Sequence, residues 1–147
     1  MAGSEGADAA VAILQRDAAD QWVRAAALSG TPERCAQIAQ AWLKNSTAAA
    51  SASSLEVVKL FAFVAGAENK RMTLDALYVA LSKSAGRAQF EDVFWASLSD
   101  GLRQARTNLR AAFPDTKSPA GRAATEALGK ASRVARDSSR PVAERLQ

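Results

Sequence analysis

Hydrophobic residues recur at helical spacing along most of the chain, in segments bounded by capping residues, glycine or proline. The first segment begins at Asp8, whose side chain can cap a helix, and ends at Gly30, a residue that favours helix termination. The pattern therefore predicts one helix between these two positions. Its apolar face consists of Val11, Leu14, Ala18, Trp22, Ala25 and Ala26.

Two more helices follow from capping signals. Thr31-Pro32-Glu33 is typical of a helix start, and the apolar period that follows predicts a helix over residues 32 to 44. Residues 45 to 54, mostly Ser, Thr and Ala, are compatible with either a loop or a frayed helix. Ser53 and Glu56 then form a capping-box pattern, which predicts a nearly buried helix over residues 54 to 66.

The next pair of helices ends at Pro114. Thr73 is a candidate cap for a fourth helix, which carries Leu74, Leu77, Tyr78 and Leu81 on its inward face and ends before Gly86. A fifth begins near Gln89, and because proline cannot continue a helix, it stops before Pro114. We expect this longest element to be the spine of the bundle. Its apolar positions are Phe90, Val93, Phe94, Leu98, Leu102, Ala105 and Leu109.

Composition supports helix throughout. The chain of 147 residues contains 35 alanines but only 11 Val and Ile residues together. Alanine has the highest helix propensity, whereas β-branched residues favour strands. We therefore predict an all-α protein, a compact bundle of about five helices with a basic, Ala-rich C-terminal helix or tail.

Apolar content falls sharply at Pro114. Residues 1 to 113 hold 25 of the 29 Leu, Ile, Val and Phe residues, together with every Trp and Tyr. A segment this poor in large apolar residues cannot build a core alone, so we predict a helical bundle domain over residues 1 to 113 and an extension over 114 to 147. Within the extension, Ser118-Pro119 can start a helix that continues to Arg136, and Pro141 would end it.

Net positive charge is confined to the C-terminal third. Residues 1 to 100 carry a net charge of −2, residues 101 to 113 carry +3, and residues 114 to 147 carry +3. The pattern R-x-A-R-x-x-x-R occurs twice there, and its spacing aligns three guanidinium groups on one face of a continuous helix. Such a stripe suits phosphates; the alternative is a solvated helix face. The candidate nucleic-acid-binding residues are Arg103, Arg106, Arg110, Arg133, Arg136 and Arg140.

Two aromatic residues fall outside the main apolar stripes. Phe63 lies two positions after Phe61, and Trp95 directly follows Phe94, so neither belongs to the predicted core face of its helix. Exposed aromatics are enriched in protein interfaces, which makes Phe63 and Trp95 candidate interface residues. The remaining aromatics are expected to pack in the core.

Catalytic and metal chemistry has little support in the sequence. The chain has no histidine, the commonest general base and zinc ligand, and its single Cys35 lies on an apolar helix face where we expect an inert thiol. We expect no cofactor and no metal. The N-terminus lacks the pattern of a secretory signal, and no apolar stretch is long enough to cross a membrane, so we expect a soluble, intracellular protein.

These observations favour a non-catalytic helical assembly subunit. In this hypothesis the protein binds nucleic acid through its C-terminal arginine surface and associates as a homo-oligomer or with a protein partner. The alternative is an adaptor or scaffold that binds another protein through Phe63, Trp95 and the Ala-rich C-terminal helix, with no nucleic-acid role. The composition alone does not distinguish DNA from RNA.

Overall fold

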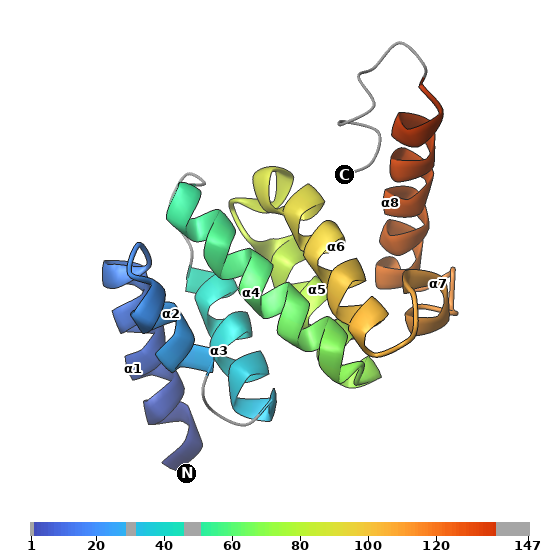
Figure 1. The fold of residues 1–147 in the computed structure, drawn as a ribbon. Coiled ribbons are helices and arrows are strands. Elements are labelled where there is room, and N and C mark those ends of the chain that lie inside the picture. Colours follow the sequence, from blue (N-terminus) through green and yellow to red (C-terminus); the bar gives the residue numbers. More distant parts are fainter. Residues whose placement is uncertain (1, 29–31, 46–50, 138–147) are drawn as a thin grey trace.

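The computed structural model describes residues 2–28, 32–45 and 51–137, and these residues form helices joined by turns (Figure 1). The all-α class is confirmed, although the described residues contain eight helices where the sequence predicted about five. None of these helices is sufficiently long and apolar to cross a membrane. In chain order they are α1 (Ala2–Asp17), α2 (Gln21–Leu28), α3 (Pro32–Asn45), α4 (Ala52–Glu68), α5 (Arg71–Lys83), α6 (Arg87–Gln104), α7 (Leu109–Ala112) and α8 (Pro119–Arg136).

The predicted first helix is in fact two helices. Asp8 lies inside α1, and the chain turns after Asp17 because the Asp20 carboxylate accepts a hydrogen bond from the Trp22 backbone N–H (2.7 Å) and so caps α2. The turn also removes Trp22 from the predicted apolar face, leaving 74% of this residue exposed. Gly30, the expected end of the helix, lies outside the described residues.

Helix starts differ from the predicted caps by a few residues. The observed capping box of α4 joins Ser51 and Ser54, each side chain accepting a hydrogen bond from the other's backbone N–H at 3.1 Å. Ser53 and Glu56 therefore lie within α4. In the same way Thr73 lies in the first turn of α5, which starts at Arg71. The helix predicted over residues 32 to 44 agrees with α3 within one residue.

The α4–α6 crossing is the closest helix contact at the centre of the molecule (Figure 1). A Cβ on Gly66 would lie 2.5 Å from the Leu98 carbonyl oxygen, and one on Gly101 would lie 2.1 Å from the Phe63 carbonyl oxygen. No real side chain fits at such distances, so the two glycines allow the backbones to touch. The spine of the bundle is thus a pair of helices.

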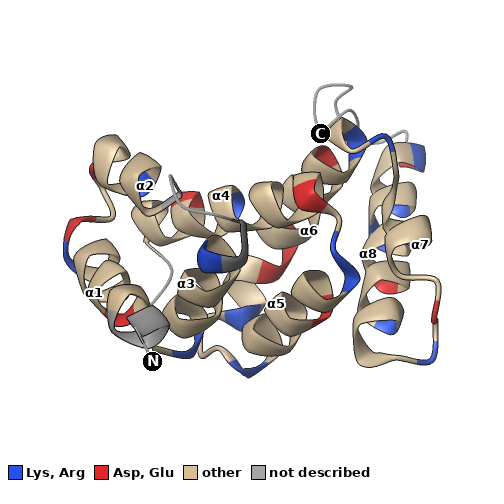
Figure 2. Ribbon diagram, turned by 90° about the horizontal axis from the view of Figure 1, so that it is seen from below, with Lys and Arg blue, Asp and Glu red and all other residues tan. Residues whose placement is uncertain are grey.

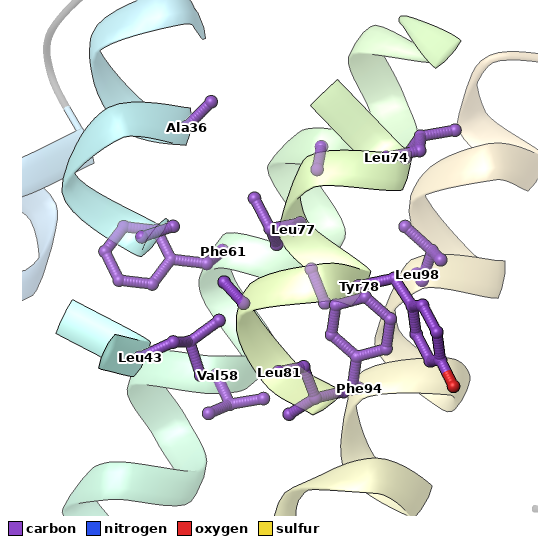
Figure 3. Close-up of a cluster of buried hydrophobic side chains, with 14 of the residues drawn as sticks. Ala36, Leu43, Val58, Phe61, Leu74, Leu77, Tyr78, Leu81, Phe94 and Leu98 are labelled. Atoms are coloured by element: carbon purple, nitrogen blue, oxygen red, sulfur yellow. The ribbon is translucent and has the colours of Figure 1, made fainter. Parts of the chain in front are cut away.

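Side chains from α3, α4, α5 and α6 fill the core around this pair (Figure 3). Leu74, Leu77 and Leu81 on α5 are almost completely buried, at the helical spacing that the sequence predicted. Phe61 and Phe94 bring aromatic rings from α4 and α6 into the same cluster (Figure 3). The sequence pattern located this part of the core correctly.

Candidate nucleic-acid interface

The long helix predicted from Gln89 to Pro114 is interrupted after Gln104. Arg106 adopts a left-handed conformation (φ 58°), its backbone N–H donates to the Arg103 carbonyl (2.9 Å), and the Thr107 N–H donates to the Leu102 carbonyl (2.9 Å). This pair of hydrogen bonds is the Schellman motif, which ends a helix and usually places glycine where Arg106 stands. The chain then turns, and the Asn108 side chain caps α7 by accepting from the Ala111 N–H (3.0 Å).

Because of this turn, the first of the two arginine patterns does not lie on one continuous helix. Arg103, Arg106 and Arg110 lie on α6, in the turn and on α7 respectively, so they do not share one helix face. Arg103 is also engaged within the protein, because its guanidinium forms a 2.6 Å ion pair with Asp100. Whether these residues contact nucleic acid stays a prediction, but they cannot do so as a continuous helical stripe.

Arg71 connects α7 to the bundle. Its Nε donates to the Asp75 carboxylate (2.8 Å), its Nη1 donates to the Ala112 carbonyl (3.4 Å), and its guanidinium lies 5.9 Å from the centre of the Phe113 ring. The Phe113 ring in turn packs against Trp95 with its centre 5.7 Å away. One cation and two aromatic rings therefore hold the turn before Pro114 against α5 and α6.

Local sequence explains where α8 begins. The Ser118 hydroxyl oxygen accepts from the Gly121 N–H (3.0 Å), and Pro119 occupies the first helical position, where its missing N–H has no consequence. A Cβ on Gly121 would lie 1.9 Å from the Asp115 carbonyl oxygen, so only glycine permits this tight entry. The sequence analysis located this start correctly from the Ser-Pro pair.

Only the first part of α8 is buried. Ala120, Ala123 and Ala124 belong to the main hydrophobic core, whereas most residues of the second half are exposed. The first part of α8 therefore contributes to the same core as the preceding helices. The division of the chain into a domain and an extension at Pro114 stays a prediction.

Three arginines lie on one exposed face of α8. Positions 11 and 14 residues apart differ by only about 20° and 40° around a helix, so Arg133 and Arg136 align with Arg122. We call these three residues the α8 basic face. The sequence pattern predicted Arg133 and Arg136 but not Arg122, because Arg122 aligns with them only across three turns of a helix. Arg140 lies outside the described residues.

Cations before and after Gly101 differ in their ion pairing. Before it, Arg16, Lys59, Lys70, Arg71 and Arg87 each pair with a carboxylate, at 2.6 to 3.4 Å. After it, only Arg103 and Lys130 do so among the described residues, and both partners are acids of α6. Figure 2 shows the basic positions of α8 at the end of the molecule opposite α1. The cations that make no ion pair with described residues there are Arg106, Arg110, Lys117, Arg122, Arg133 and Arg136.

The two candidate interface aromatics have different environments. Trp95 is only 5% exposed and its ring contacts those of Tyr78, Phe94 and Phe113, so the prediction of an exposed Trp95 is wrong. It failed because the chain turns back after α6, which brings the Phe113 ring onto Trp95, and because α8 lies beside it. Phe63 is 38% exposed, which is compatible with a contact role.

A mixed-charge cleft separates α6 from α8. Its walls include Arg87, Glu91, Asp92, Glu126 and Lys130, with Trp95 among the lining residues. Lys130 bridges the cleft by donating to both Asp92 carboxylate oxygens at 2.6 and 2.7 Å. Burial raises the pKa of the nearby Tyr78 hydroxyl, an effect that the positive charge of Arg87 partly opposes. The Lys130–Asp92 ion pair therefore connects α8 to α6 across this cleft.

The described residues offer no cluster of metal ligands. They contain no group of three His, Cys, Asp or Glu side chains placed to hold a metal ion, and the Cys35 thiol is buried as expected. The fold and its exposed arginines define an all-α protein with a cationic end. Comparisons with protein families, curated proteins and solved structures give no match for this chain.

Proposed function

We propose that the protein is a non-catalytic helical assembly subunit that binds nucleic acid through the α8 basic face. The observation that carries the proposal is the contrast in pairing: Arg122, Arg133 and Arg136 make no ion pair with described residues, whereas most cations of α1 to α6 do. Unpaired cations on one surface attract a polyanion, while paired ones are already neutralised.

The geometry of the face suits a phosphate backbone. Arg122 and Arg136 are 14 residues apart, about 21 Å along the helix axis, so the face can reach several phosphates of one strand. Arginine presents a planar fork of donors that matches phosphate oxygens in a bidentate manner. Arg110 on α7 extends the cationic surface beyond α8 itself. Contacts to phosphates alone carry no sequence information, so we expect binding with little sequence preference.

A structural role for these arginines is the competing explanation. Arg133 and Arg136 lie in the last turn of α8, where cations stabilise the helix dipole by about 0.3–1 kcal/mol each. The experiment therefore needs control residues in the same structural position. Arg16, Lys44 and Lys83 supply them, since each lies in the last turn of its helix and far from α8 along the chain.

The test compares two variants of equal charge. The face variant carries Arg122→Gln, Arg133→Gln and Arg136→Gln, and the control carries Arg16→Gln, Lys44→Gln and Lys83→Gln. We expect the face variant to flatten the plot of log K against log salt concentration by about 2 to 3 units, for DNA or RNA of generic sequence. The control should change the slope by less than about 1 unit. Equal slopes for both variants, or no binding by the wild type at about 50 mM salt, would refute the proposal.

The adaptor alternative rests on Phe63. This residue lies on the outer side of α4 and is partly exposed, whereas Trp95 is no longer available as a surface anchor. In that case neither triple variant would affect function, and replacing Phe63 with Ser would abolish partner binding without unfolding the protein.

A further inference from the structure

An apolar groove lies between α7 and the exposed half of α8. Its volume is about 590 Å³. Leu109, Phe113 and Leu128 provide apolar lining, and Arg110 adds a positive charge that makes no ion pair with the described residues. Gly129 also lines the groove, and a Cβ at this position would meet nothing within 4 Å. By contrast, the buried helical glycines, Gly66, Gly101 and Gly121, are all in close backbone contact.

The opposite end of the molecule carries an exposed apolar group beside acids. Trp22 is 74% exposed at the start of α2, and Ile13 on α1 is 46% exposed. Asp17 and Asp20 flank the turn between the two helices. We call Asp17, Asp20 and Trp22 the Trp22 knob. A side chain as large as Trp exposed to this degree is typical of a contact surface.

We infer that the Trp22 knob of one copy docks into the α7–α8 groove of a second copy. Charge favours this occupant, because residues 1 to 100 carry a net charge of −2 whereas residues 101 to 147 carry +6. Apolar surface meets apolar surface, and the Asp20 carboxylate, which makes no ion pair with the described residues, approaches Arg110. A groove-to-groove contact would instead bring two cationic α8 helices together, which repulsion disfavours.

The placement of the two surfaces sets the type of assembly. α1 and α2 lie at one end of the molecule and α7 and α8 at the other, as Figures 1 and 2 both show. A knob therefore cannot reach the groove of its own chain, and the contact is head-to-tail. Such a contact leaves one knob and one groove open after each addition, so it builds a row or ring of subunits. This contact would align the α8 basic faces of successive copies along a nucleic acid, but it does not depend on nucleic-acid binding.

A mixing experiment tests the head-to-tail contact. Trp22→Ser removes the knob and Leu128→Glu spoils the groove, so each purified variant should be monomeric by analytical ultracentrifugation at concentrations where the wild type associates. An equimolar mixture still contains one intact knob and one intact groove. It should therefore form a species of twice the monomer mass and nothing larger. Association of either variant alone, a monomeric mixture, or a wild type that stays monomeric throughout would overturn the inference.

Control variants keep each outcome interpretable. Met72→Ser removes an apolar side chain that is 86% exposed on α5, outside both surfaces, and should leave association unchanged. If Leu128→Glu fails to fold, Thr116→Glu replaces it, because Thr116 is exposed and lines the groove from outside α8. None of these changes touches Arg122, Arg133 or Arg136, so binding to an oligonucleotide long enough for one subunit should persist. Failure of assembly and failure of nucleic-acid binding are therefore separate results.

Discussion

Small residues have different structural roles at the α4–α6 crossing and in α8. At the crossing, Gly66 and Gly101 place the backbones of two helices in direct contact, and large side chains surround them. In α8, Ala120, Ala123 and Ala124 bury only methyl groups, and Gly129 faces open space. Small residues are present in both regions and do not by themselves distinguish them. What distinguishes them is whether large apolar residues occupy the neighbouring positions of the helix.

The difference has an energetic consequence. Buried apolar area stabilises a fold by about 25 cal/mol per Å², and a methyl group contributes little of it. The α4–α6 pair is therefore expected to be the most stable part of the molecule, and the second half of α8 the least. The proposed docking groove lies in the less stable region, where apolar residues such as Leu128 are only partly buried within the monomer.

The largest predicted effect concerns Trp95, which joins the two regions. Its ring contacts Phe94 within α6, Tyr78 on α5 and Phe113 beyond α7. Trp95→Ala should lower the free energy of unfolding by about 3–5 kcal/mol, as measured by urea denaturation. A loss below about 1 kcal/mol would mean that the ring is a surface group, as the adaptor hypothesis assumed.

A smaller effect is expected from adding one methyl group at the crossing. Gly101→Ala forces a Cβ to within 2.1 Å of the Phe63 carbonyl oxygen, so α4 and α6 must separate. We expect a loss of about 1–3 kcal/mol in the free energy of unfolding. The matched control is Gly129→Ala, which should instead stabilise the protein by about 0.5–1 kcal/mol because nothing opposes the new methyl group. If both substitutions changed the free energy of unfolding in the same direction, the proposed difference between the crossing and α8 would be wrong.

Sequence periodicity predicted the core better than it predicted the helix ends. Leu74, Leu77 and Leu81 were found at the expected spacing, because burial of one helix face depends only on the local period. The break after Gln104 was missed, since Leu102 and Leu109 continue the same period on either side of the turn. No glycine marked the turn either, because Arg106 occupies the position where one is usual.

Because the break after Gln104 was missed, the first group of candidate arginines was also placed wrongly. Alignment of Arg103, Arg106 and Arg110 required a continuous helix, which the turn removes. Arg133 and Arg136 did not depend on it, because Ser118 and Pro119 define the start of α8 from local chemistry alone. Burial of Trp95 also escaped prediction, since it depends on how α7 and α8 fold back, a long-range contact that no local pattern encodes.

A modest gain is expected at the turn itself. A non-glycine residue in the left-handed conformation is strained by about 1–2 kcal/mol, and Arg106 bears this strain at the end of α6. Arg106→Gly should therefore raise the free energy of unfolding by about 1 kcal/mol, observed as a higher midpoint in urea. Arg106→Ala serves as the control, because it removes the same charge but keeps the strain, and its midpoint should stay near that of the wild type. A gain in both variants would attribute the effect to charge instead.

The smallest effect is predicted for the ion pair that holds α8 against α6. Lys130 donates to Asp92 at 2.6 and 2.7 Å, but both side chains are more than half exposed, so water screens the attraction. Lys130→Gln should lower the global free energy of unfolding by no more than about 0.5 kcal/mol. Amide hydrogen exchange should still detect the loss of this ion pair, because residues 128 to 136 have few buried apolar contacts to oppose local opening. We expect faster exchange in those residues of the variant, no change at the α4–α6 crossing, and convergence of variant and wild type at high salt. Equal acceleration in both regions would show that α8 and the central helix pair open as one unit.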